Sequence, residues 1–148
     1  MEISDWINLI AAILVGGGTL ALAFMTWKSI RQTRRQRISD NIRIWARNAL
    51  GMLVFADTTQ SPSETLEQEV NRLKTGIKSI FSETNSIIND ANKLGEVCSQ
   101  KVLKTIHALT KYVAILEHAQ DAKYADKILA LHRELLEGLA DIIDTVSK

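Results

Sequence analysis

Residues 6–27 decide the fold of this chain: they read WINLIAAILVGGGTLALAFMTW and contain no ionisable side chain. A helix of this length rises roughly 31 Å, which matches the ~30 Å hydrocarbon thickness of a bilayer. Trp6 and Trp27 would then place one indole ring at each interface. The start of the chain lacks the basic residues and the small-residue cleavage site of a signal peptide, so the segment should be retained. We therefore expect residues 1–27 to form a transmembrane anchor.

The charges on the two sides of this segment predict its orientation. Glu2 and Asp5 precede it, and residues 28–47 hold seven basic residues against one acidic residue. Because basic residues are retained on the cytoplasmic side, we expect the N-terminus outside and the remainder in the cytoplasm, at the plasma membrane. Residues 28–37 form a basic juxtamembrane segment, called the basic collar below; its cations are Lys28, Arg31, Arg34, Arg35 and Arg37. The collar either contacts anionic lipid headgroups or acts only as a topology signal that binds no ligand. The collar has no interleaved aromatic residues, which argues against nucleic-acid binding.

Small and weakly polar residues recur along one side of the expected span, at steps of four and three. This small-residue face consists of Asn8, Ala12, Gly16, Thr19, Ala23 and Thr26. A separate, bulky face consists of Leu9, Ile13, Leu20, Phe24 and Trp27. Helices in lipid associate through small-residue faces because their backbones can approach closely. The pattern predicts helix–helix packing and a homo-oligomer.

The stretch from the end of the span into the collar, AFMTWKSIRQTRRQR, resembles the start of a broad group of uncharacterised prokaryotic single-span membrane proteins. In that group one N-terminal helix with a small-residue centre runs into a juxtamembrane helix rich in Thr and Arg. The resemblance covers about the first 40 residues, in keeping with the anchor-and-collar pattern of single-span proteins. It implies topology and carries no activity.

Apolar periodicity predicts that residues 38–148 form an antiparallel bundle of about four helices, so that the fold class is all-α with an N-terminal transmembrane helix. The first expected stripe is Ile38, Ile42, Trp45, Ala49 and Met52, widened by Leu53 and Phe55. The second has the four-three seam of a coiled coil: Leu66, Val70, Leu73, Ile77, Ile80, Thr84, Ile87, Ala91 and Leu94. The third is Val102, Ile106, Leu109, Val113 and Leu116. The fourth is Tyr124, Ile128, Leu131, Leu135, Ile142 and Val146.

Local signals predict where these helices begin and end. The run Ser61-Pro62-Ser63-Glu64 has the form of a capping box with proline at the first helical position. Gly95 suits a helix C-terminus, and Asp121 is the plausible cap before the last helix. A turn centred near residues 59 and 60 would set Glu83 beside Arg35 and Asp90 near Lys28 and Arg31.

Residue patterns that support catalysis or metal binding are not apparent in the sequence. A di-iron bundle needs Glu-x-x-His pairs on facing helices, and the chain has none. His118 and Asp121 share one helix face but offer only two ligands at a helix end. Cys98, the single cysteine, has no histidine nearby in sequence and is best explained as a structural thiol. We expect no enzyme activity, no cofactor and no metal.

Two classes of function fit these patterns. The first is a non-catalytic, membrane-anchored helical bundle that serves as an oligomeric scaffold or interaction module at the cytoplasmic membrane face, with a protein partner that the sequence does not identify. The second is a subunit of a homo-oligomeric pore, in which Asn8, Thr19 and Thr26 would line a ring of helices and meet water. The heptad-like seam and the collar favour the first class, because a lone Asn and two Thr are also common between packed membrane helices.

Overall fold

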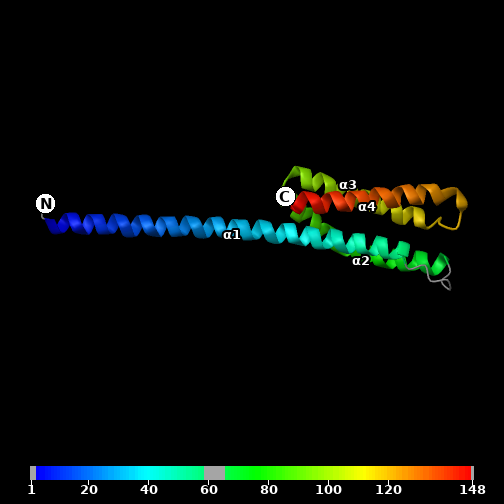
Figure 1. Cartoon of the computed structure of the whole chain (residues 1–148), viewed down its shortest axis with the longest axis horizontal. Coiled ribbons are helices and arrows are strands. Elements are labelled where there is room, and N and C mark those ends of the chain that lie inside the picture. Colours follow the sequence, from blue (N-terminus) through cyan, green and yellow to red (C-terminus); the bar gives the residue numbers. More distant parts are fainter. Residues whose placement is uncertain (1–2, 59–65, 148) are drawn as a thin grey trace. The chain divides into compact units, whose positions relative to one another are not determined.

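The computed structural model describes residues 3–58 and 66–147, and their side chains at 12–54, 67, 68 and 70–147. In this part of the chain the fold is all-α and contains no strand (Figure 1). The chain forms four helices: α1 (Ile3–Thr58), α2 (Leu66–Leu94), α3 (Glu96–Leu116) and α4 (Ala125–Ser147). One short 3-10 turn, η1 (Ala122–Tyr124), lies between α3 and α4. The chain divides into two compact units, Met1–Arg37 and Ile38–Lys148. One helix, α1, therefore covers both the expected span and the first expected helix of the bundle.

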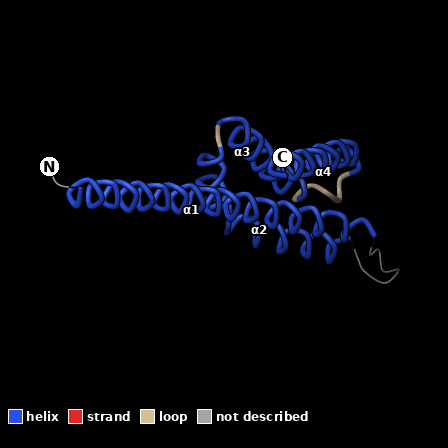
Figure 2. The backbone as a smooth tube through the Cα atoms, turned by 60° about the vertical axis from the view of Figure 1, so that its left-hand side comes forward, coloured by secondary structure: helices blue, strands red, loops and turns tan. Residues whose placement is uncertain are grey.

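The second unit is a four-helix bundle in which successive helices run in opposite directions (Figures 1 and 2). Two contacts show that α3 and α4 are antiparallel, because the partner on α4 moves to a lower number as the residue on α3 moves to a higher one. Lys101 Nζ lies 2.8 Å from Asp141 Oδ1, and Tyr112 Oη lies 3.1 Å from His132 Nδ1. Contacts between α2 and α3 follow the same rule. Ser99 Oγ donates to Asn92 Oδ1 at 2.5 Å, close to the turn that joins the two helices.

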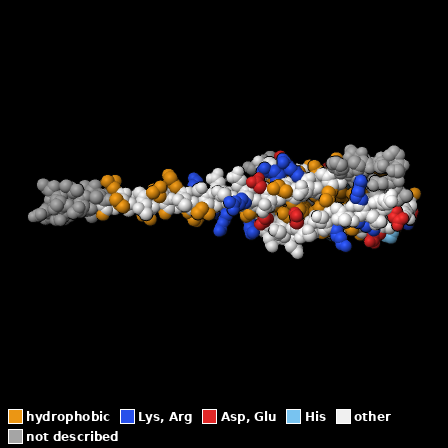
Figure 3. Space-filling view, turned by 90° about the horizontal axis from the view of Figure 1, so that it is seen from below, with side chains coloured by type: hydrophobic (Ala, Val, Ile, Leu, Met, Phe, Trp, Pro, Cys, Tyr) orange, Lys and Arg blue, Asp and Glu red, His pale blue; other side chains and the backbone are white. Residues whose placement is uncertain are grey.

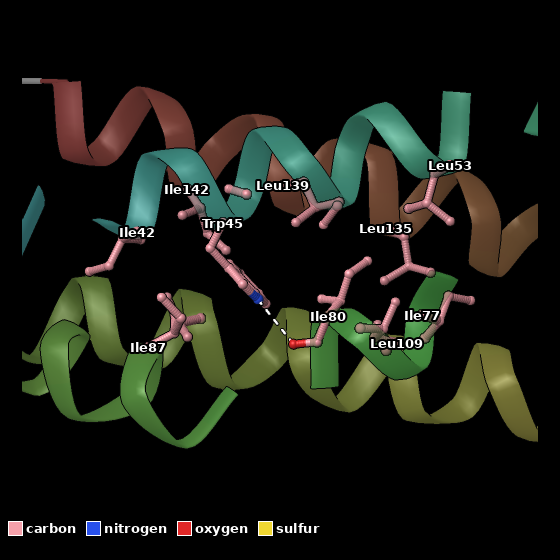
Figure 4. Close-up of a cluster of buried hydrophobic side chains, with 14 of the residues drawn as sticks. Ile42, Trp45, Leu53, Ile77, Ile80, Ile87, Leu109, Leu135, Leu139 and Ile142 are labelled. Atoms are coloured by element: carbon pink, nitrogen blue, oxygen red, sulfur yellow. Dashed lines mark hydrogen bonds between the residues drawn. The ribbon is translucent and has the colours of Figure 1, made fainter. Parts of the chain in front are cut away.

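The core of the bundle is built from the apolar faces of all four helices. Trp45 of α1 points between its neighbours toward α2 (Figure 4) and is 2% exposed. The other large side chains with almost no exposure are Ile42, Leu53, Ile77, Val102, Leu135, Leu139 and Ile142. Burying one such side chain contributes about 1.5–3 kcal/mol, so this layer holds the four helices together.

The predicted stripe of α2 is confirmed as the face that packs inward. Ile77, Ile80, Thr84, Ile87 and Ala91 are all buried, at the steps of four and three that the sequence shows. Val70, Leu73 and Leu94 are partly buried against the same core, and the side chain of Leu66 lies outside the described residues. The stripes of α3 and α4 are confirmed in the same way, since their expected members are buried or half-buried, but Tyr124 lies in η1, just before α4 begins.

Two turns occur where the sequence predicts them. Gly95 separates α2 from α3 with φ +125°, a backbone conformation that other residues rarely adopt, and its N–H donates to Ala91 O at 3.2 Å. At the other end of α3, the Asp121 carboxylate accepts a hydrogen bond from Lys123 N at 3.0 Å and caps η1. The capping box expected at residues 61–64 lies outside the described residues.

The bundle closes by contacts between the start of its first helical segment and the end of α4. Ser39 Oγ donates to the carbonyl oxygen of Val146 at 2.5 Å, and Arg43 Nη2 lies 3.5 Å from the same oxygen. Carbonyls in the last turn of a helix lack intrahelical partners, and the C-terminal end of the helix dipole favours a cation. Ser39 and Arg43 therefore cap α4 from another helix.

The predicted pairing of α1 with α2 is wrong. Asp90 accepts a hydrogen bond from Asn41 Nδ2 at 3.4 Å, so its partner on α1 is ten or more residues later than the expected Lys28 and Arg31. Trp45 Nε1 donates to Ile80 O at 3.4 Å, which requires the same direction of shift. Because α1 ends at Thr58 and α2 begins at Leu66, the connection is centred later than residues 59 and 60.

One expected core position of α1 is also wrong. Met52 is 39% exposed, whereas Leu53 and Ala46 are fully buried. The buried stripe passes through positions 42, 46, 49 and 53, so Met52 falls at its edge. Its sulfur lies over Gly76 of α2, where an added Cβ would meet Met52 Sδ at 3.0 Å.

Candidate membrane anchor and basic collar

The N-terminal part of α1 exposes apolar side chains all round. Leu14, Leu22 and Phe24 point to three different sides of the helix and are 70%, 67% and 62% exposed. Among its described residues, 3–37, the first unit contains no second helix or strand that could cover them. A helix that is apolar on every side is stable only where water is excluded, either inside a large protein or in a membrane.

By length and composition α1 is apolar enough to cross a membrane. The helical stretch Ala12–Val54 contains an 18-residue window of mean hydropathy 1.4, and none of that window is buried inside the structure. Figure 3 shows hydrophobic side chains along this part of the helix, followed by Lys and Arg side chains. This is the one candidate span among the described residues.

The small-residue face is open along its described length. Ala12, Gly16, Thr19, Ala23 and Thr26 are all exposed, and a Cβ added at Gly16 would meet nothing within 4 Å. Five residues at these steps fall within an arc of roughly 80° at 100° per residue. The side chain of Asn8 lies outside the described residues.

The two threonines of this face satisfy their own hydroxyl groups. Thr19 Oγ1 donates to Val15 O at 2.8 Å, and Thr26 Oγ1 donates to Leu22 O at 2.8 Å. Such bonds to the carbonyl four residues earlier are a common solution for Ser and Thr in apolar surroundings. Neither hydroxyl therefore needs water or a second helix to satisfy its donor.

The basic collar is exposed, and no acidic residue occurs within it. All five of its cations are exposed, and no Asp or Glu occurs between Asp5 and Asp40. Among the described residues the first ion pair along α1 comes only after the collar, between Arg43 and Asp40 at 3.4 Å. Five positive charges within ten residues create a strong local field that attracts anions.

The collar is joined to the apolar stretch through Trp27. The Arg31 guanidinium lies over the Trp27 ring, 5.5 Å from its centroid, a cation–π arrangement. Phe24 lies on the other side of Trp27, with ring centroids 6.1 Å apart. Sequence reasoning treated Trp27 and Arg31 separately, although their spacing of four residues places them on one helix face and could have revealed the pair.

The bundle unit holds polar pairs between helices rather than a reactive cluster. Lys101 Nζ donates to both Asp141 Oδ1 and Thr145 Oγ1 at 2.8 Å. Tyr112 and His132 join α3 to α4 in the core. In the part of the chain that the structure describes, no group of three or more His, Cys, Asp or Glu side chains could hold a metal ion.

Cys98 and the histidine near the last turn occupy unremarkable positions. Cys98 is free and buried, and burial raises the pKa of its thiol above 9.0 despite the opposing charge of Lys101. A raised pKa keeps the thiol protonated and unreactive. His118 stacks on Tyr124 with ring centroids 5.1 Å apart, while Asp121 caps η1 instead of sharing a ligand site with it.

A shallow groove of about 710 Å³ lies between the outer faces of α3 and α4, near the tip of their hairpin. Ala114, Ile115, Ala130 and Leu131 form its floor. Sequence reasoning did not find it, because a groove depends on which two helices become neighbours.

Known proteins give no further guide. No protein-family model, no curated protein and no solved structure matches this chain.

Proposed function

We propose that this protein is a non-catalytic, membrane-anchored helical bundle that acts as an oligomeric scaffold or interaction module at the cytoplasmic face of the plasma membrane. The observation that carries the proposal is the fully exposed apolar stretch of α1. Each exposed Leu or Phe forgoes about 1.5–3 kcal/mol of burial, and the first unit has no means of recovering it. A bilayer supplies the apolar surroundings that these side chains need.

The direction of insertion follows from the charges that flank the span. Glu2 and Asp5 lie before it, and the basic collar lies after it. Retention of basic residues in the cytoplasm then places the N-terminus outside and the bundle inside the cell.

The polar side chains of the bundle pair with one another between helices, which supports a structural role. Ser99 pairs with Asn92, and Lys101 with Asp141, each across two helices. Pairs of this kind fix the register of packed helices, which is what a module that presents a surface to a partner requires.

Topology is tested by adding a protease to sealed right-side-out vesicles. The bundle should stay intact, because it lies inside, and the protein should remain in the membrane after an alkaline carbonate wash. Digestion of the bundle would refute the orientation, and release by carbonate would refute the span.

Oligomer formation is tested by bulk on the small-residue face. Gly16→Leu should weaken self-association in a membrane-embedded dimerisation reporter, since the larger side chain separates the backbones and loses many dispersion contacts. Ile13→Leu, on the bulky face, is the matched control and should leave association unchanged. If Gly16→Leu associates as strongly as the parent chain, the small-residue face does not mediate association, and any oligomer must form through the bundle helices.

The second candidate function is a subunit of a homo-oligomeric pore. It is supported by the position of Thr19 and Thr26 on one face, and weakened by their hydroxyl bonds to Val15 O and Leu22 O, which leave less polarity for a water-filled lumen. Ion flux through liposomes that contain the purified chain would favour the pore over the scaffold.

A further inference from the structure

The basic collar has two sides that continue the two faces of the apolar stretch. At 100° per residue, Lys28, Arg31 and Arg35 fall within an arc of about 60° that overlaps the bulky face. Arg34 and Arg37 fall on the other side, in line with the small-residue face. The collar is therefore not a uniform ring of charge.

On the first side, aromatic and cationic groups are in contact. Phe24, Trp27 and Arg31 form a continuous row, with 6.1 Å between the two ring centroids and 5.5 Å from the guanidinium to the indole centroid. Stacking on Trp27 fixes the guanidinium beside the last apolar turn, and Lys28 and Arg35 lie three residues before and four residues after it. Neighbours at these spacings have Cβ atoms about 5–6 Å apart, close enough for two cations to reach one phosphate.

We propose that Lys28, Arg31 and Arg35 bind the phosphate of an anionic phospholipid whose acyl chains lie along Leu20 and Phe24. This inference rests on the proposed membrane span. The sequence has no carboxylate between Asp5 and Asp40, so no acidic residue within four positions of these three cations competes with an external anion. Arg guanidinium groups suit phosphate because they donate paired hydrogen bonds.

The apolar surroundings identify a lipid as the source of the phosphate. Leu20 and Phe24 are more than 60% exposed and lie on the same side as the three cations. A soluble phosphate or a nucleic acid would use the charges and leave this apolar row uncovered, whereas a phospholipid covers both. Arg34 and Arg37 continue the small-residue face, where Ile30 is exposed but the neighbouring Ala23 and Thr26 offer an acyl chain less apolar surface than Leu20 and Phe24 do.

The test compares two double variants that remove the same number of charges. Arg31→Gln with Arg35→Gln changes the proposed lipid side, and Arg34→Gln with Arg37→Gln changes the other. Each full-length protein is reconstituted in phosphatidylcholine vesicles, and electron paramagnetic resonance measures the motionally restricted fraction of spin-labelled phosphatidylglycerol and of spin-labelled phosphatidylcholine. The ratio of the two gives the selectivity for the anionic lipid.

We expect the parent chain and Arg34→Gln/Arg37→Gln to prefer phosphatidylglycerol, and Arg31→Gln/Arg35→Gln to lose about threefold or more of that preference. An equal loss in both double variants would overturn the two-sided assignment and leave only total charge. Persistence of the preference in both would overturn the lipid site itself. A carbonate wash distinguishes these results from failure of the proposed function. If the wash releases the parent chain from the vesicles, the chain has no membrane span, and both the proposed function and the lipid site are wrong.

Discussion

The indole N–H of Trp45 donates to the main-chain carbonyl of Ile80 at 3.4 Å, across 35 residues of sequence (Figure 4). The ring is buried among the core residues of all four helices, and this bond satisfies its one polar atom. A buried tryptophan with a satisfied N–H links α1 to α2 more specifically than an apolar side chain of the same size would.

We expect Trp45→Phe to lower the free energy of unfolding of the bundle by about 1–3 kcal/mol, because it removes both the hydrogen bond and part of the ring. The measurement is urea unfolding of the full chain in mild detergent, followed by circular dichroism. Ile44→Phe, at an exposed position on the same helix, is the control and should change stability by less than about 0.5 kcal/mol. Equal stability of Trp45→Phe and the parent would contradict the central place given to Trp45.

The close approach of α3 to α4 predicts an unfavourable Gly138→Ala substitution. A Cβ at position 138 would lie 2.8 Å from Thr105 Oγ1, which is held by a 3.0 Å bond to Lys101 O. We expect Gly138→Ala to lower the free energy of unfolding by about 1 kcal/mol, since overpacking outweighs the gain in helix propensity.

A double variant isolates the cause. In a Thr105→Ala background the obstructing hydroxyl is gone, so Gly138→Ala should stabilise the bundle by up to about 1 kcal/mol. Gly51→Ala, which meets nothing within 4 Å, should stabilise it by a similar amount. A Gly138→Ala effect that is the same with and without Thr105 would show that the contact is not responsible.

The turn between α2 and α3 predicts a glycine requirement at position 95. Because φ is +125° there, Gly95→Ala should cost about 1–3 kcal/mol of stability even though the site has open space. Thermal unfolding by circular dichroism measures the loss. Glu96→Gln, one residue later, should be nearly neutral, and a neutral Gly95→Ala would mean that the turn can adopt another backbone conformation.

The raised pKa of Cys98 predicts a dependence of stability on alkaline pH. Burial raises the pKa of the thiol in the folded state above 9.0, so the unfolded chain loses this proton first. The contribution of Cys98 is fully present below about pH 9 and is lost as pH rises through the folded-state pKa. Urea unfolding between pH 7 and pH 11 should show a steeper alkaline decline for the parent chain than for Cys98→Ala. If the stability of the parent chain and of Cys98→Ala fell equally with pH, the Cys98 thiolate would be solvated in the folded state.

Much of the bundle could be predicted from local patterns. The stripe of α2, the glycine at position 95 and the cap at Asp121 follow from periodicity and residue type alone, because each reflects a preference of a short segment. The apolar stretch of α1 is equally local, since its length and composition decide it.

Relationships between helices could not be predicted in the same way. The pairing of α1 with α2 depends on the length of the connection, which shifts the partner of Asp90 to Asn41. The Tyr112–His132 contact and the groove between α3 and α4 depend on which helices become neighbours and at what register. Polar residues at single positions carry no periodic signal, so only the folded arrangement reveals what they contact.

The contact of Ser39 with Val146 affects the order of events during synthesis. The two residues are 107 positions apart, and a ribosome takes roughly 5–20 s to translate that distance. During this interval α2 is available to cover one side of the first bundle segment, but the side that packs against α4 has no partner. The nascent chain therefore passes through a stage in which an apolar surface is open to chaperones, proteases and other nascent chains, and the arrival of α4 ends it.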